Sequence, residues 1–285
     1  MIQFGMRVHD ICPKGSVCEV LDEVQKLHLH YIHLAMNKSF SDVDTSVGHF
    51  NAGFGDYVAS ELRKRDLHVS ILGCYINPAH PDEEKRLQQV QRFIEHLKYA
   101  KLIGADMVGT ETGRADPEMK AVAETYTEEN YLRVLDSFKR IRDAAEKLGV
   151  MVGVESVYNH TLRSPEMMRR FLDDIDSVNF DVILDAVNLV TPDLQHDSAG
   201  QNALIRKAFD FYGDRITTLH LKDCVFEGED QKYRHPGEGI FCYEELMRQV
   251  SRWKPYIIGT LENSSPDRYA EDCAYLQAMY EKYAI

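Results

Sequence analysis

The segment EENYLRVLDSFKRIRDAAEKLGVMVGVE, Glu128–Glu155, contains one amphipathic helix followed by one buried strand. Its first part repeats apolar residues with a period near 3.6 and closes on Gly149, which suits the left-handed conformation that ends many helices. The run that follows, Met151–Glu155, is short and continuously apolar, as expected for a strand buried on both faces. The segment therefore predicts an α/β unit whose strand ends on a carboxylate, Glu155.

The same alternation of helix and strand runs along the whole chain. A second helical segment, Glu83–Gly104, also closes on a glycine, and Ser164–Glu166 and Ser265–Asp267 each supply an N-cap hydroxyl, a proline and an acid in the first turn. We expect helices to begin at both triplets. The predicted strands are Gln3–Val8, Tyr31–Ala35, Val69–Tyr75, Met107–Glu111, Met151–Glu155, Val182–Val187, Thr217–Lys222 and Ile257–Glu262.

Eight strand–helix units in 285 residues give about 36 residues per unit, the size of a βα unit without a large insertion. An open doubly wound sheet shares this alternation, but the chain lacks the GxGxxG motif of its dinucleotide-binding version. The sequence predicts the α/β class and a single domain, residues 1–285, folded as a (β/α)8 TIM barrel.

The charge and the cysteines exclude several classes of protein. The net charge is -13, from 33 Lys and Arg against 46 Asp and Glu, and a surface of that sign repels nucleic acid and anionic membranes. The chain starts without a basic and apolar leader, and no run approaches the ~18 apolar residues of a membrane span. Six scattered cysteines indicate reduced thiols and no metal motif. We expect a cytoplasmic protein with no nucleic-acid or membrane partner.

Four metal-binding types of side chain lie at the ends of successive predicted strands: Glu155, Asp185, His220 and Glu262, separated by 30, 35 and 42 residues. Each alone has an ordinary explanation, such as helix capping or a core histidine. Together they would lie at one edge of the barrel, where TIM-barrel active sites form. Burying three like charges is strongly unfavourable without a cation. Their oxygens and one imidazole nitrogen suit a divalent ion such as Mn2+, Co2+, Mg2+ or Zn2+.

These residues and their surroundings resemble a known family. The motifs GVES, ILDAVNL, HLKD, PGEG and LEN, between Gly153 and Asn263, are similar to those of the xylose isomerase-like TIM-barrel superfamily. It contains sugar isomerases, ketose 3-epimerases, hydroxypyruvate isomerases, inosose dehydratases and the AP endonuclease family. The resemblance implies a metal site, with manganese preferred, made by the same four residues. It also implies that Glu155 and Glu262 act as acid and base on an enediolate, and that the barrel assembles as a dimer or tetramer.

Two positions depart from the ketose 3-epimerases of this family. Those enzymes have a histidine three residues after the strand-six aspartate, where this chain has Asn188. They also have an arginine six residues after the strand-seven histidine, where this chain has Phe226. Both departures affect substrate contacts and leave the metal set intact.

Four further residues are candidates for substrate binding: Lys222, Glu111, Asn188 and His160. Lys222 shares the strand face of His220, but a structural pairing with Asp223 or Glu262 is an equal alternative. Glu111 ends strand four, where it could contact substrate hydroxyl groups. Alternatively, it could only hydrogen-bond a neighbouring loop.

The remaining histidines have structural explanations. We expect His28 and His30 to face solvent or the helix layer, no metal site in the His28–His33 group, and a helix lead-in or pocket-wall position for His80. His235–Gly239 is interpreted as a turn, with a lid over the substrate as the alternative.

The predicted function is that of a metal-dependent isomerase or epimerase of a small sugar, sugar phosphate or related polyol. A dehydratase acting on an inosose-like substrate would use the same metal and base. A nuclease would need further metal ligands and a basic surface, and a non-catalytic sugar-binding barrel would not need both glutamates.

Overall fold

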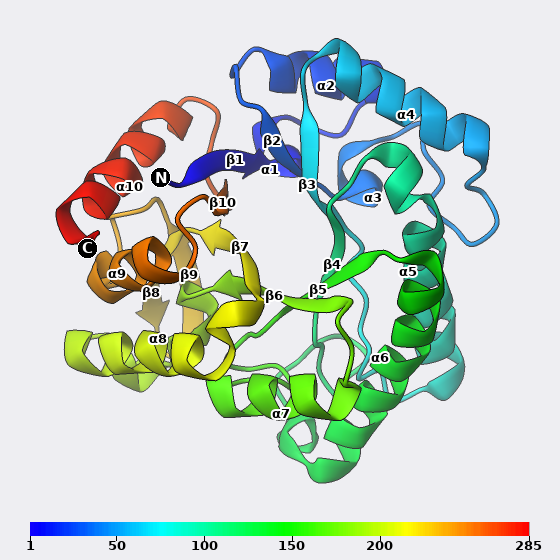
Figure 1. The fold of residues 1–285 in the computed structure, drawn as a ribbon. Helices are drawn as coiled ribbons and strands as arrows, with labels where there is room; N and C mark the ends of the chain where they lie inside the picture. Colours follow the sequence, from blue (N-terminus) through cyan, green and yellow to red (C-terminus); the bar gives the residue numbers. More distant parts are fainter. Residues whose placement is uncertain (285) are drawn as a thin grey trace.

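Eight parallel strands close into a barrel (Figure 1). The computed structural model describes residues 1–284 of the chain. The strands pair in the order β1-β10-β7-β6-β5-β4-β3-β2, so the first and last barrel strands are neighbours. The α/β class and the (β/α)8 barrel are confirmed. The barrel strands are β1 Gln3–Arg7, β2 Tyr31–Leu34, β3 His68–Gly73, β4 Met107–Glu111, β5 Met151–Glu155, β6 Phe180–Asp185, β7 Ile216–Leu221 and β10 Ile258–Leu261.

Helices surround the barrel on its outside (Figure 1). Short 3-10 turns occupy Ala123–Tyr126, Val187–Leu189, Pro192–Leu194 and Gly213–Arg215. The α-helices are α1 Val8–Ile11, α2 Val17–Gln25, α3 Met36–Ser39, α4 Ala52–Lys64, α5 Glu83–Ile103, α6 Glu128–Leu148, α7 Pro165–Ile175, α8 Ser198–Tyr212, α9 Tyr243–Trp253 and α10 Tyr269–Tyr283. No helix within residues 1–284 is both long and apolar enough to cross a membrane.

Most predicted helix ends are confirmed. Gly104 and Gly149 end α5 and α6 with φ of 86° and 61°, a backbone region that side chains disfavour. Ser164 caps α7 by accepting a hydrogen bond from the amide of Met167. The six cysteines are all free.

The expected helix start at Ser265–Asp267 is wrong, because α10 begins at Tyr269. The triplet instead forms a turn in which the amide of Arg268 donates to the Ser265 carbonyl at 3.0 Å. The N-cap hydroxyl and the acid are satisfied inside this turn, where the Ser265 side chain binds Asp267 and lowers the pKa of that carboxyl. Local polar groups therefore compete with helix formation at this site.

Close packing fills the barrel interior. Ile71, Met107 and Ile183 form a buried cluster that is separate from the larger core between strands and helices. Gly153 makes room for it, because a Cβ at this position would lie 2.5 Å from Met107 Sδ and 2.8 Å from Ile183 Cδ1. The interior below the strand ends is thus closed, and polar side chains gather at the mouth.

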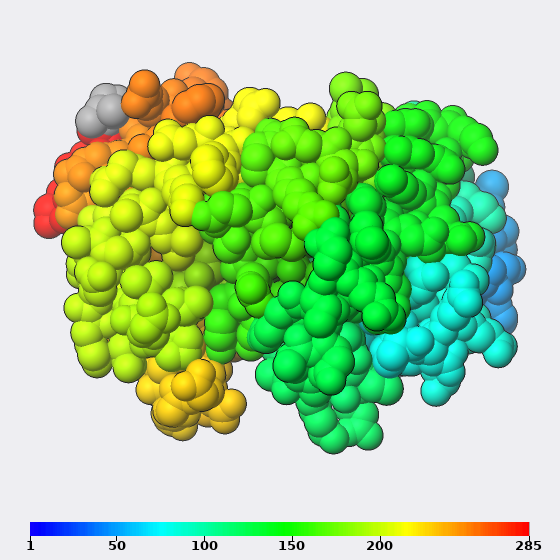
Figure 2. Space-filling model, turned by 90° about the horizontal axis from the view of Figure 1, so that it is seen from below, coloured from blue at the N-terminus to red at the C-terminus, as the bar shows by residue number. Residues whose placement is uncertain are grey.

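A two-stranded antiparallel hairpin, which the sequence analysis did not predict, follows β7 directly. Its strands are β8 Asp223–Glu227 and β9 Asp230–Arg234. In Figure 2 the hairpin, in gold, and the connection that follows β4, in green, project on the same side of the molecule with a notch between them. The hairpin therefore forms a raised wall beside the barrel mouth.

The aromatic core between α6, α7 and the barrel offers a test of this packing. Phe138 is fully buried, with its ring centroid 5.1 Å from that of Phe171 and 6.1 Å from that of Phe180. We expect Phe138→Ala to lower the free energy of unfolding by about 3–5 kcal/mol in denaturant titrations, because it leaves a cavity. Leu132→Ala on the exposed side of the same helix should change it by less than about 0.5 kcal/mol. Equal losses in both variants would contradict this packing.

Candidate metal centre

The barrel brings the four predicted ligands together at the C-terminal ends of its strands. Glu155 and Asp185 are the last residues of β5 and β6, His220 lies in β7, and Glu262 follows β10 directly. All four are buried. His220 Nδ1 lies 3.0 Å from Glu155 Oε2 and 3.4 Å from Glu262 Oε1. Asp185 is the register partner of His220 in the neighbouring strand.

Several polar atoms of this cluster lack a hydrogen-bond partner. Within residues 1–284, both ring nitrogens of His220 and Oδ2 of Asp185 are buried and make no hydrogen bond, although His220 Nδ1 and Asp185 Oδ2 lie at ion-pair distances from Glu155 and Lys222. Buried polar atoms without partners usually mark a ligand, ion or water site. Oxygen donors with one imidazole nitrogen fit a divalent cation.

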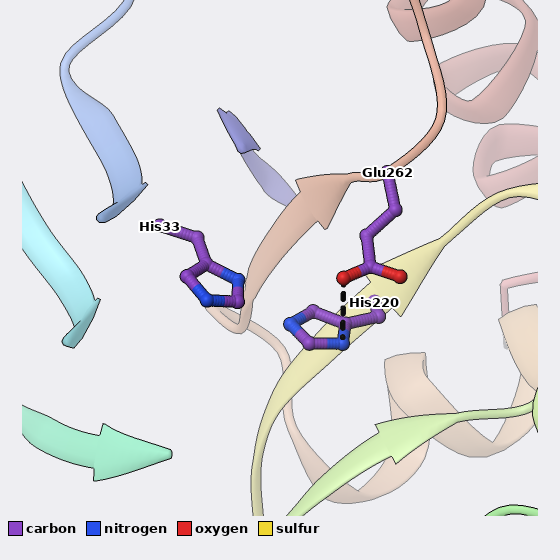
Figure 3. Close-up of side chains that lie close together, drawn as sticks. All are labelled: His33, His220 and Glu262. Atoms are coloured by element: carbon purple, nitrogen blue, oxygen red, sulfur yellow. Dashed lines mark ion pairs between the residues drawn. The ribbon is translucent and has the colours of Figure 1, made fainter. Parts of the chain in front are cut away.

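His33, which the sequence analysis assigned to the structural histidines, joins this cluster. Its ring stacks on His220 at 5.2 Å between centroids, and Figure 3 shows both rings with Glu262 in the barrel mouth. Two overlapping groups therefore each place three donor atoms within 4.8 Å of one another: Glu155–Asp185–His220 and His33–His220–Glu262. The expected exposure of His28 and His30 is confirmed. The alternation of side chains along β2 does not predict that His33 would contact His220 of β7.

Lys222 lies among the carboxylates and not in the solvent. Its Nζ is 2.6 Å from Asp185 Oδ2 and donates a hydrogen bond to Glu262 Oε2 at 2.9 Å. The proposed pairing with Glu262 is therefore confirmed, whereas Asp223 instead accepts hydrogen bonds from the amides of Cys224 and Phe241. Lys222 supplies a positive charge that offsets the buried acids.

Arg7 is a second cation that sequence reasoning missed. Its Nη1 donates to Glu262 Oε1 at 3.1 Å, and its Nε donates to Asp10 at 2.8 Å. Arg7 ends β1, which neighbours β10 in the closed barrel, so this contact depends on barrel closure. No local motif indicates it.

These contacts set the protonation states of the cluster. Burial alone would lower the pKa of His220, but the charges of Glu262 and Glu155 outweigh it and raise the pKa to about 9. Burial would raise the pKa of Glu262, but His220, Lys222 and Arg7 hold it well below its ordinary value. Burial dominates at Asp185 and raises its pKa to about 6, even though Lys222 opposes the shift.

The other predicted substrate-binding residues lie around the cluster. Asn188 Nδ2 donates to Glu155 Oε1 at 2.7 Å, and the backbone N–H of Asn188 donates to Asp185 Oδ1 at 2.9 Å. Glu111 is the register partner of Glu155 in β4, and His160 Nδ1 lies 3.6 Å from Glu111 Oε2. Asn188 therefore orients the candidate acid-base residue directly.

A cavity of about 490 Å3 opens beside the cluster, between the β4 and β5 connections and the hairpin. Its volume lies within the ~300–1,000 Å3 typical of small-molecule sites. Its lining residues are Glu111, Arg114, Lys120, Ala121, Val157, Tyr158, Asn159, His160, Asn188, Glu229, Asp230, Gln231, Lys232 and Tyr233.

The remaining sequence expectations concern loops around the mouth. His80 is buried and accepts a hydrogen bond from the amide of Asp82, the cap of α5, so it leads into that helix. Gly237 has a φ of 87°, which confirms the glycine turn in His235–Gly239. Phe226 lies in β8 and packs edge-on against Tyr158 at 6.0 Å between ring centroids.

Known structures share this whole architecture. A D-tagatose 3-epimerase-like protein superposes with a TM-score of 0.75 at 16% identity, covering 99% of this chain and 98% of that chain. The apo 3-keto-D-glucoside 4-epimerase of E. coli gives 0.71 at 15% identity, covering 98% and 100%. The IOLI protein with a bound zinc atom gives 0.72 at 15% identity, covering 99% of each chain. At these identities the likeness establishes the fold.

The profile of the Xylose isomerase-like TIM barrel family matches residues 21–279, and the chain belongs to this family. The resemblance drawn from the motifs is thereby confirmed. No curated protein matches the chain at a significant level of sequence similarity.

Glu111 gives a pH test of the cavity. About a third of its side chain is exposed, and the residue lines the cavity. Burial, and next the charge of Glu155, raise the pKa of Glu111 from 4.5 to about 7. Between these values the folded protein holds more protons than the unfolded chain, so this group lowers stability as pH rises from about 4.5 to 7. In chelator-treated protein, the Tm of Glu111→Gln should therefore fall less than the Tm of wild type between pH 5 and pH 8.

The matched control is Glu129→Gln, at the exposed start of α6. The Tm of this variant should change with pH as that of wild type does. Carbon-detected NMR should also show a side-chain carboxyl that titrates near pH 7 and disappears in Glu111→Gln. A carboxyl of Glu111 that titrates near 4.5 would refute the assignment.

Proposed function

We propose that this protein is a divalent-metal-dependent isomerase or epimerase of a small sugar, sugar phosphate or related polyol, which moves a proton next to a carbonyl through an enediolate. The observation that carries the proposal is that Glu155 and Glu262, from strands separated by β6 and β7, both contact His220. Two carboxylates can then reach one bound substrate from different sides.

We propose Glu155, Asp185, His220 and Glu262 as the ligands of the ion. The oxygen-rich donor set and the ring nitrogens of His220, which make no hydrogen bond, support this, and manganese is the preferred metal, with zinc, magnesium or cobalt as alternatives. The zinc atom of the IOLI protein supports a divalent ion. When bound, such an ion stabilises the negative charge that develops on a carbonyl oxygen.

The chain's own residues hold and move the proton. In the proposed reaction, one glutamate removes the carbon-bound proton and the other returns a proton to the intermediate. Asn188 binds Oε1 of Glu155, whereas Lys222 and Arg7 bind Oε2 and Oε1 of Glu262, so both carboxylates are held in fixed orientations. Lys222 also offers positive charge to an enediolate, while Glu111 and His160 face the cavity where hydroxyl groups would lie.

Hydrogen exchange tests the acid-base roles. The metal-loaded protein is incubated with ketoses, aldoses and their phosphates in D2O, and NMR follows deuterium at carbon. Glu155→Gln and Glu262→Gln should each lower the exchange rate by about a hundredfold or more, because each loses a proton carrier. Full activity in both variants would rule out these roles.

Glu95→Gln is the control, since Glu95 is a buried carboxylate of α5 that binds the amide of Gly48 and the ammonium of Lys98. It should keep the wild-type exchange rate. Product analysis separates the two chemistries that the site could support: isomerisation keeps all atoms of the substrate, whereas a dehydratase would release water and form a dehydrated dicarbonyl product.

Metal content tests the ligand set. Elemental analysis of manganese- or zinc-loaded wild-type protein should give one ion per chain. Asp185→Asn and His220→Gln should weaken ion binding by at least about a hundredfold, because each removes a donor atom.

His33→Gln separates the two overlapping donor groups, since it removes the imidazole of only one. It should retain the ion, as should His96→Gln in the buried part of α5. Loss of the ion in His33→Gln with retention in Asp185→Asn would move the site to the His33–His220–Glu262 group.

A further inference from the structure

We propose that the substrate carries an anionic group, a carboxylate or a phosphate, distant from its reacting carbonyl, and that Arg114 binds this group. The inference rests on the proposed function, which places the carbonyl at the metal cluster. It adds a specificity-determining residue and narrows the substrate class to acidic or phosphorylated sugars.

Arg114 is held in a fixed position at the wall of the cavity. Its amide donates to Asn77 Oδ1 at 3.1 Å, and Asn77 Nδ2 donates back to the Arg114 carbonyl at 2.9 Å. The guanidinium is held at one end, where Nη1 donates to the Met119 carbonyl at 2.6 Å. An arginine fixed in this way loses little entropy when it binds a ligand.

The positive charge of Arg114 has no counter-ion in the described part of the chain. The residue is half-buried, and its Nε is fully buried without a hydrogen-bond partner. The neutral carbonyl of Met119 satisfies one N–H and leaves the charge uncompensated. A partly desolvated guanidinium attracts an anion more strongly than a solvated one, and a charged N–H donor makes a strong hydrogen bond to a carboxylate or phosphate.

The other charged groups of the cavity wall do not fill this role. Lys120 pairs with Glu118, and Lys232 lies 3.7 Å from Asp230, so both lysines have partners. Glu229 and Asp230 belong to the exposed end of the hairpin, where water screens their charges. Arg114 therefore dominates the field at its end of the cavity.

Different charges act on two residues of the cavity wall. After burial, the largest charge effects on the pKa of Glu111 come from Glu155 and Glu262 at the barrel centre. Burial and then the charge of Arg114 lower the pKa of His160 to about 3, so this imidazole is neutral at physiological pH. Both Glu111 and His160 line the cavity. A ligand with its carbonyl at the cluster would thus extend past Glu111 and His160 toward Arg114.

Neutral polar groups of the cavity wall suit hydroxyl groups. The buried atoms Nδ1 of His160, Oδ1 of Asn159 and Oδ1 of Asn188 have no hydrogen-bond partner within residues 1–284. All three residues line the cavity. A polyhydroxylated chain that ends in an anion satisfies these atoms and the charge of Arg114 together.

Equilibrium binding tests the proposal. Isothermal titration calorimetry on the metal-loaded protein compares three probes: a neutral 2-ketohexose, the same sugar with a terminal phosphate, and a keto sugar acid with a terminal carboxylate. At least one anionic probe should bind about tenfold or more tightly than the neutral sugar, and raised salt should reduce this difference. The probe that gains more identifies the anion as phosphate or carboxylate.

Arg114→Gln should weaken binding of the preferred anionic probe by about 10- to 100-fold and leave the neutral sugar unchanged. Arg114→Lys should recover part of the loss, which guards against misfolding in the glutamine variant. Arg163→Gln is the matched control, because Arg163 is exposed and stacks on Tyr126 outside the cavity. It should bind all probes within about twofold of wild type.

Equal affinity for neutral and anionic probes, no binding of either anionic probe, or an unchanged affinity in Arg114→Gln would overturn the proposal. The exchange assay keeps this result distinct from the proposed function. Exchange on the anionic sugar that Arg114→Gln leaves intact would keep the isomerase function and reject the anion site. Anion binding through Arg114 without any exchange would do the reverse.

Discussion

The burial of three carboxylates at one end of the barrel is the constraint on which the site depends. Glu155, Asp185 and Glu262 are each almost inaccessible to solvent, and like charges in such surroundings are tolerated only when cations compensate them. Lys222 and Arg7 supply two of these cations from within the chain. The chain therefore offsets part of this negative charge internally, and a divalent ion would have to share Asp185 and Glu262 with Lys222.

The parallel register of the strands brings these charged side chains together at one end of the barrel. Because all eight strands point the same way, each strand end adds one side chain to the same mouth, and register pairs such as Asp185 with His220 become neighbours. The closed, apolar interior below the mouth, built around Ile183, excludes water from the lower side of the cluster. Electrostatic interactions there are stronger than at a surface.

The sequence predicted the parts of the molecule that repeat or that carry local signals. Continuous apolar runs and glycine caps located the strands and helices, and Glu155, Asp185, His220 and Glu262 lay where runs end. It could not predict contacts that depend on barrel closure, such as Arg7 with Glu262 or the stacking of His33 on His220. The hairpin was missed for a different reason, because β9 is short, polar and largely exposed and so lacks an apolar pattern.

The acidic composition of the chain does not determine what its cavity attracts. A net charge of -13 arises mostly from solvated side chains, whose fields fall off over about 8 Å at physiological ionic strength. Inside the cavity, fixed charged groups lie much nearer to a bound ligand than the surface acids do, so they outweigh many distant charges. Arg114 and Glu111 both line this cavity, and the guanidinium of Arg114 makes no ion pair within residues 1–284. A protein that repels polyanions such as nucleic acid can therefore still select a small anion, since selection depends on desolvated charge and not on the total.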